Sequence, residues 1–134
     1  MVHFITGKSG VGKTTLAYRM AYEMAQRGVR VIVLDGARFR KWFPSDFTDE
    51  GRQRNVEMVA TFAAMLEEQG YTVIVELFAP TRALRMAARR KWAQSQLVYL
   101  PGGTVWGGTT YEEPTTEEFV EMFRNTPSGA PCTA

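Results

Sequence analysis

A glycine-rich segment near the N-terminus has the composition and the spacing needed to hold a nucleotide phosphate. Gly7 to Thr14 reads GKSGVGKT and fits the P-loop pattern G-x-x-x-x-G-K-[ST]. Its glycines let backbone N–H groups turn inward around phosphate oxygens, and a helix that begins there would point its positive end at the same anion. The predicted phosphate-binding residues are Gly7, Lys8, Ser9, Gly10, Val11, Gly12, Lys13, Thr14 and Thr15.

Two side chains of this segment have separate chemical tasks. Lys13 can bridge the β and γ phosphates of ATP as a point charge, which makes it a candidate catalytic residue. The hydroxyl of Thr14 is placed to ligate the magnesium ion that accompanies the nucleotide. We therefore expect ATP and Mg2+ as cofactors.

Two carboxylates follow apolar runs and complete the candidate catalytic set. Asp35 comes directly after the run that spans residues 29–34, and Glu76 follows the apolar run that begins at Tyr71. Ligands of open α/β sheets bind at the carboxyl ends of the parallel strands. We predict that Asp35 and Glu76 are catalytic and that they ligate magnesium together with Thr14. A turn residue at a strand end is the alternative interpretation for Asp35.

Hydrophobic periodicity places these residues in an α/β fold. β-Branched and aromatic runs predict strands at residues 2–6, 29–34, 71–78 and 96–100. Apolar residues at helical spacing predict helices at residues 13–27, 49–69, 81–93 and 115–124. Thr115 and Glu118 match a capping box at the start of the last helix. We expect a three-layer sandwich, in which a parallel sheet of four to five strands has helices on both faces.

Length, charge and cysteine usage restrict the class of protein. The 134 residues suffice for one domain, which we expect at residues 1–126, with a flexible tail at 127–134. A formal net charge of +2 is too small to indicate binding to nucleic acids or membranes. The single cysteine, Cys132, excludes an internal disulfide, and no apolar run approaches the roughly 20 residues of a membrane span. These features predict a cytoplasmic protein.

Five segments together resemble the adenylylsulfate kinases, which phosphorylate the ribose 3'-hydroxyl of adenylylsulfate with ATP. They are GKSGVGKTT at 7–15, LDGARFR at 34–40, DFTDEGRQRN at 46–55, FAPTR at 78–82 and TYEEP at 110–114. The resemblance runs from about Val2 to Glu118. It implies a P-loop kinase-type fold, transfer of a phosphoryl group to a hydroxyl, and a homodimer.

The resemblance also implies an acceptor site. In that family, the segments matching Arg40, Phe47, Arg52 and Asn55 hold the acceptor nucleotide, with the arginines on its charged groups and the aromatic ring on its base. Guanidinium groups suit phosphate and sulfate oxygens, and Arg52 and Asn55 are three residues apart on one helix face. The candidate acceptor-binding residues are Arg40, Phe47, Arg52, Asn55 and Arg82.

The chain departs from the family pattern at three places. Ala37 stands where the family has the second aspartate of a DGD motif, which accepts the hydroxyl proton. Ala79 stands where the family has a serine, and the long basic lid is reduced to PGGTVWGG. Loss of this base need not end catalysis, because phosphoryl transfer relies mainly on positioning and charge stabilisation. Glu76 or Asp35 is the expected substitute. Trp106 in the shortened lid either stacks on a base or fills the core.

These departures leave two alternative functions open. The first is a kinase that acts on a hydroxymethylated base in DNA, because Arg82, Arg85 and Arg89 fall on one face of the predicted helix 81–93 and would suit a polyanion. The other interpretation of that face is a solvated basic helix whose first arginine touches ATP phosphates. The second alternative is a catalytically impaired module that only binds a nucleotide.

Overall fold

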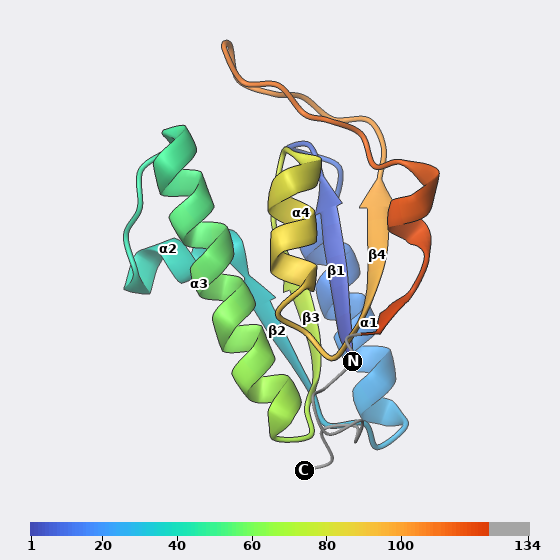
Figure 1. Cartoon of the computed structure of the whole chain (residues 1–134). Coiled ribbons are helices and arrows are strands. Elements are labelled where there is room, and N and C mark those ends of the chain that lie inside the picture. The colour runs from blue at the N-terminus through green and yellow to red at the C-terminus, as the bar shows by residue number, and fades with distance from the viewer. Residues whose placement is uncertain (124–134) are drawn as a thin grey trace.

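A five-stranded sheet forms the centre of the chain (Figure 1). The computed structural model describes residues 1–123. The strands are β1 Val2–Gly7, β2 Val31–Asp35, β3 Thr72–Glu76, β4 Gln94–Leu100 and β5 Met122–Phe123. Their order across the sheet is β2-β3-β1-β4-β5; the first four are parallel, and β5 runs antiparallel to β4. The predicted α/β class and strand number are confirmed, and only the short fifth strand departs from the parallel arrangement.

Helices cover both faces of the sheet, as predicted. They are α1 Lys13–Gln26, α2 Gly36–Trp42, α3 Asp49–Glu68, α4 Arg82–Arg89 and the 3-10 helix η1 Thr116–Phe119. Figure 1 shows α3 and α4 in front of the sheet and α1 behind it. The front core joins Phe4 of β1 to Val59 of α3 and to Trp92, whereas Ile5 and Ile74 pack with Ala17 of α1 on the other face. Among residues 1–123, no helix combines the length and apolar character that crossing a membrane requires.

The strand register gathers the polar groups at one edge of the sheet. Asp35 at the end of β2 lies opposite Glu76 at the end of β3, and Glu76 also pairs with Ile5 of β1. Two residues after Ile5, β1 ends at Gly7, where the P-loop begins. Because the strands are parallel, their carboxyl ends meet at this edge, which is where open α/β sheets bind ligands.

The predicted helix at residues 115–124 is wrong beyond its first turn. The capping box of Thr115 and Glu118 is present, but only η1 forms, and the chain then extends into β5. The guanidinium of Arg89 donates to the backbone carbonyls of Glu118 and Val120, which a longer helix would need for its own hydrogen bonds. The predicted tail at 127–134 lies outside the described residues.

The proposed basic face of α4 is also wrong for two of its three arginines. Arg85 and Arg89 are 0% and 1% exposed, so they are neither solvated nor open to a polyanion. Arg85 donates to the Glu118 carboxylate at 2.8 Å and to the carbonyls of Ala79 and Glu112 at 2.9 and 2.8 Å. These contacts satisfy a buried charge and tie α4 to the segment that follows β4.

Replacing Glu118 by glutamine should lower the free energy of unfolding by roughly 3 kcal/mol, because Arg85 would keep its buried charge without the carboxylate that neutralises it. Denaturant titration followed by circular dichroism measures this loss. Glu68→Gln removes the same charge from the exposed end of α3 and should change the free energy by less than about 0.5 kcal/mol. Equal losses of unfolding free energy in Glu118→Gln and Glu68→Gln would contradict a stabilising role of the Arg85–Glu118 ion pair.

Candidate active site

The P-loop has an open set of backbone donors. Gly10 and Gly12 adopt φ angles of 79° and 94°, a left-handed region that favours glycine. The N-cap of α1 is Gly12, which has no side chain that could cap the helix. The first turn of α1 also carries no acidic residue. Free N–H groups and an uncompensated helix dipole at this point favour an anion.

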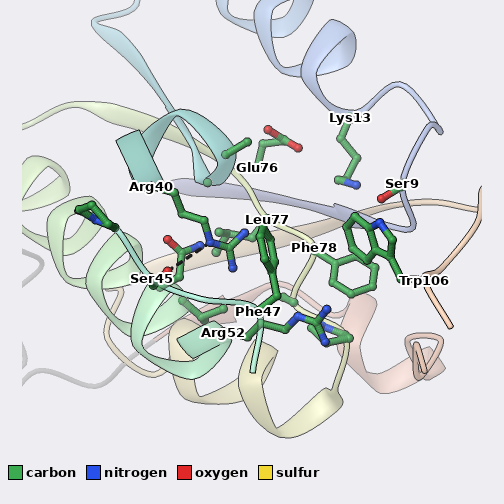
Figure 2. Close-up of a pocket in the computed structure, with 17 residues that line it drawn as sticks. Ser9, Lys13, Arg40, Ser45, Phe47, Arg52, Glu76, Leu77, Phe78 and Trp106 are labelled. Carbon is green, nitrogen blue, oxygen red and sulfur yellow. Dashed lines mark hydrogen bonds between the residues drawn. The ribbon is translucent and has the colours of Figure 1, made fainter. Parts of the chain in front are cut away.

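The ammonium group of Lys13 folds back over the P-loop. Its Nζ donates to the carbonyls of Gly7 and Lys8 at 2.8 and 2.9 Å. Burial lowers the pKa of Lys13, while the nearby carboxylates of Glu76 and Asp35 oppose this shift. Figure 2 shows the side chain directed into a pocket, so phosphate oxygens entering there could replace the two carbonyls as its partners.

The structure brings the two predicted carboxylates together beside Thr14. The Thr14 hydroxyl donates to Oε2 of Glu76 at 3.4 Å, and Asp35 lies opposite Glu76 on the neighbouring strand. Burial, followed by the charge and a hydrogen bond of Asp35, raises the pKa of Glu76 to about 7. Asp35 has a second task, because its Oδ1 accepts the backbone N–H groups of Ala37 and Arg38 and so caps α2.

This group of oxygens fits a magnesium ion that arrives with phosphates. Magnesium in nucleotide sites uses one or two carboxylates and a hydroxyl, and the phosphate oxygens and water complete its octahedron. Thr14 and Glu76 offer a hydroxyl and a carboxylate within one hydrogen bond of each other. The two backbone N–H groups that cap α2 both contact Oδ1 of Asp35, so neither of them occupies its Oδ2.

One pocket of about 500 Å³ joins the P-loop to the predicted acceptor residues. Its lining includes Arg40, Phe47, Arg52 and Asn55, together with Ser9, Lys13 and Glu76 (Figure 2). The remaining lining residues are Gly36, Ala37, Pro44, Ser45, Val56, Leu77, Phe78, Ala79, Pro80 and Trp106. Arg82 is not among them, because its side chain is half exposed and lies 3.5 Å from the Glu118 carboxylate.

The two arginines of the pocket are held by neutral groups. Arg40 donates to the hydroxyl of Ser45 at 3.2 Å and lies 4.4 Å above the ring of Phe47. Arg52 donates to the hydroxyl of Thr109 at 3.3 Å. Within residues 1–123 neither guanidinium forms an ion pair, and burial together with the charge of Arg52 lowers the pKa of Arg40. An anion bound between them would relieve this repulsion.

Asn55 presents an acceptor that the described part of the chain does not satisfy. The residue is 6% exposed, and its Oδ1 has no hydrogen-bond partner among residues 1–123. Buried polar atoms are almost always paired in native structures, so an orphaned acceptor that lines a pocket indicates a ligand donor.

Two aromatic residues of the pocket were not assigned to it from the sequence. Trp106 is 54% exposed, so the interpretation that it fills the core is wrong. Its ring centroid lies 6.0 Å from that of Phe47 and 5.9 Å from that of Phe78. Phe78 begins the FAPTR segment two residues after β3 ends, and this position near a strand end was the available signal. The glycine-rich surroundings of Trp106 carry no periodicity that would have placed it.

Curated relatives of this chain are adenylyl-sulfate kinases. The chain is 34% identical over 99 residues to the enzyme of Burkholderia ambifaria, covering 72% of this chain and 55% of the relative. It is 40% identical over 90 residues to the enzyme of Paraburkholderia xenovorans, covering 66% and 50%. The chain therefore spans about half the length of the curated relatives that it matches.

Solved structures show the same fold. The structure titled "Crystal structure of APE1195" superposes with a TM-score of 0.71 at 32% identity and covers 76% of this chain and 60% of that chain. The Mycobacterium tuberculosis APS kinase in complex with AMPPNP and APS superposes with a TM-score of 0.70. Its identity is 24%, and the match covers 75% of this chain and 61% of that chain, so it supports the fold alone.

The family model described as adenylylsulphate kinase matches residues 1–102. This range contains the P-loop, both carboxylates and the four acceptor candidates that line the pocket, and it stops short of Glu118, to which we extended the resemblance. Residues beyond 102, including Trp106, fall outside the match. The chain belongs to the adenylylsulfate kinase family.

Proposed function

We propose that the chain is an ATP- and magnesium-dependent kinase that transfers the γ-phosphoryl group to the 3'-hydroxyl of adenylylsulfate. One observation carries the proposal: a single pocket of about 500 Å³ is lined both by P-loop residues and by four family-matched acceptor residues. Phosphoryl transfer requires the donor phosphate and the acceptor hydroxyl in line and in contact, which one shared pocket permits. A homodimer, a cytoplasmic location and a domain at 1–126 remain predictions.

The P-loop end of the pocket would bind the triphosphate. Its backbone N–H groups would surround the phosphates, and Lys13 would exchange the carbonyls of Gly7 and Lys8 for β and γ oxygens. Thr14, Glu76 and Asp35 would hold the magnesium ion, which supplies neutralisation of the charge on the transferred group.

The opposite end of the pocket would bind adenylylsulfate. Arg40 and Arg52, which form no ion pair within residues 1–123, provide two guanidinium groups for its phosphate and sulfate oxygens. The ring of Phe47 is available to pack on the base, and Oδ1 of Asn55 can accept a hydrogen bond from the ligand. Arg82, which lies outside the pocket lining, remains only a predicted contact.

We assign the acceptance of the hydroxyl proton to Glu76. Ala37 has no group that can accept a proton, whereas the Glu76 carboxylate lines the pocket close to Lys13. The pKa of about 7 is that of the ligand-free chain, and a bound magnesium ion would lower it, so the carboxylate would be ionised and able to accept a proton when the nucleotide is present. The demand on the base is small, because the transition state of phosphoryl transfer is loose.

The alternative of a DNA-modifying kinase loses its main support. It was suggested by Ala37, the short lid and the arginine face of α4, and Arg85 and Arg89 of that face are buried in contacts with the chain itself. The alternative of an impaired nucleotide-binding module becomes an outcome of the activity assay.

ATP consumption should rise when adenylylsulfate is added and should yield its 3'-phosphorylated product, whereas hydroxymethyl-bearing DNA and buffer alone should have no effect. Lys13→Ala should reduce this turnover by at least about 100-fold, because the charge on the transferred phosphate loses its partner. Lys41→Ala, on the exposed face of α2, serves as the control and should retain turnover. The proposal would be overturned if ATP consumption rose with DNA but not with adenylylsulfate, or if it rose with neither acceptor.

Replacing Arg52 by alanine should raise the KM for adenylylsulfate by about 10- to 100-fold, because a charge-assisted hydrogen bond to the acceptor is lost. The KM for ATP should stay within about twofold of the wild-type value, since Arg52 lies at the acceptor end of the pocket. Arg54→Ala removes an exposed arginine from the same helix and should leave both constants unchanged. An equal rise in the KM values for adenylylsulfate and for ATP would contradict a specific contact of Arg52 with the acceptor.

The ligand-free protein should lose stability as the pH rises, because of Glu76. Its folded-state pKa of about 7 lies above the ordinary value of 4.5. The raised pKa of Glu76 therefore contributes stability that is fully present below pH 4.5. This contribution is lost as the pH rises through about 7, where the folded protein must ionise the buried carboxyl. The Glu76→Gln variant cannot ionise at this position. The melting temperature of the variant minus that of the wild type should therefore increase between about pH 5 and about pH 8. A difference in thermal scans that does not change with pH would contradict the raised pKa.

A further inference from the structure

The segment that leaves β4 crosses the P-loop before it returns to the sheet. We call residues 101–111, with the sequence PGGTVWGGTTY, the strap. Figure 1 shows this segment extending from β4 across the carboxyl edge of the sheet. Nearly all of its residues are exposed, so the strap buries little apolar surface of its own. Its position therefore depends on a few specific contacts.

We propose that the strap is a positioning element in which Gly103 and Thr104, through their attachment to the P-loop, hold Trp106 and Thr109 against the acceptor pocket. Acceptor affinity then depends on the state of the P-loop. The inference rests on the proposed function for the identity of the acceptor, but the attachment itself is a property of the ligand-free chain.

The attachment consists of two backbone hydrogen bonds and one close approach. Ser9 N donates to the carbonyl of Thr104, and Thr104 N donates to the carbonyl of Ser9, each at 3.1 Å. Gly103 has a φ of 79°, and a Cβ there would lie 2.5 Å from both the Ser9 carbonyl oxygen and a methyl group of Val11. Only glycine therefore allows the strap to reach the P-loop in this conformation.

The other contacts of the strap lead to the acceptor pocket. Two residues after Thr104, the ring of Trp106 meets the rings of Phe47 and Phe78 (Figure 2). The Thr109 hydroxyl accepts the hydrogen bond that orients Arg52, and its N–H closes a turn onto the carbonyl of Trp106 at 2.9 Å. A shift at Thr104 is thus transmitted to two groups that define the pocket wall.

The end of the strap is held independently of the P-loop. The hydroxyl groups of Tyr111 and Thr6 lie 2.9 Å apart, and Glu112 N donates to the carbonyl of Pro80 at 2.7 Å. Within the described residues, the strap's backbone bonds to the P-loop are the pair with Ser9. Loss of this pair would release the middle of the strap and leave its ends in place.

Nucleotide binding acts on the residues that hold the strap. Lys13 now holds the carbonyls of Gly7 and Lys8, and phosphates would draw its ammonium away and order the loop around Ser9. An ordered P-loop lowers the entropy cost of docking the strap, so the nucleotide should strengthen acceptor binding. By linkage, the acceptor should strengthen nucleotide binding by the same factor.

The test compares three glycine variants of the full chain. Gly103→Ala places a methyl group against the P-loop, whereas Gly102→Ala has the same left-handed strain, with a φ of 88°, but meets no atom within 4 Å. Gly107→Ala has neither strain nor contact. Calorimetric titration of adenylylsulfate, with and without the non-hydrolysable ATP analogue AMPPNP, gives the coupling factor for each.

We expect AMPPNP to strengthen adenylylsulfate binding by about tenfold in the wild type and in the two controls, and by less than about twofold in Gly103→Ala. In steady-state kinetics, Gly103→Ala should raise the KM for adenylylsulfate and leave kcat near the wild-type value. In a double-mutant cycle, Gly103→Ala should have a smaller effect once Trp106→Ala is present, because only the contact of Thr109 with Arg52 then remains to transmit it. The proposal would be overturned if AMPPNP strengthened adenylylsulfate binding in Gly103→Ala as much as in the wild type. It would also be overturned if Gly102→Ala lost this strengthening to the same extent as Gly103→Ala.

A second measurement separates this proposal from the proposed function. In a Trp42→Phe background, buried Trp92 and exposed Trp106 remain, and a further Trp106→Phe change identifies the emission that comes from Trp106. AMPPNP alone should change this Trp106 emission and slow hydrogen exchange of the Thr104 amide, and both effects should vanish with Gly103→Ala. Absence of both effects in the parent protein would refute the coupling, whatever the acceptor is. Their presence without binding or phosphorylation of adenylylsulfate would refute the proposed acceptor and keep the strap's attachment.

Discussion

The position of β3 between β1 and β2 is the constraint on which the site depends. Parallel pairing on both sides leaves no freedom for Glu76, which must face Asp35 on one side and the end of β1 on the other. The P-loop then begins two residues after Ile5, so Thr14 comes within a hydrogen bond of Glu76 without any long connection. A carboxylate buried beside another carboxylate is costly unless a cation or a proton compensates it. The sheet therefore places two carboxylates, which favour a bound cation, next to the P-loop, whose N–H groups favour an anion.

Buried Arg85 of α4 supports the far wall of the same pocket. Ala79 lines the pocket with a φ of 39°, an unusual conformation for a residue that is not glycine. Arg85 donates to the carbonyl of Ala79 and to that of Glu112 at the end of the strap, and Glu118 neutralises its charge. Strained backbone persists only where its surroundings determine it. The ion pair thus fixes the pocket wall and the exit of the strap, which explains why these charges are buried rather than solvated.

Sequence patterns predicted the elements with a strong period and missed those set by single tertiary contacts. The P-loop, α1 and α3 followed from glycine spacing and helical periodicity. The seven-residue α2 was missed, because its start depends on the Asp35 side chain, which we had assigned to ligand chemistry or to a turn and not to a helix cap. Arg85 and Arg89 have the same spacing whether they face water or backbone carbonyls, so periodicity alone did not reveal their burial. Of the acceptor residues, physics alone related only Arg52 to Asn55; the rest came from the family resemblance.

The two departures at Ala37 and in the lid change which parts of the chain carry the chemistry. Position 37 supplies a backbone N–H to Asp35, so Asp35 is partly engaged in starting α2, and Glu76 is the carboxylate that lines the pocket. In the lid region, a short strap attached at Ser9 provides an aromatic wall with few residues. A long lid can close over a site through its own packing. An exposed eleven-residue segment is held in place only by its contacts with neighbouring segments. In this chain, that neighbour is the P-loop, so the element that we propose to bind the nucleotide would also shape the proposed acceptor pocket.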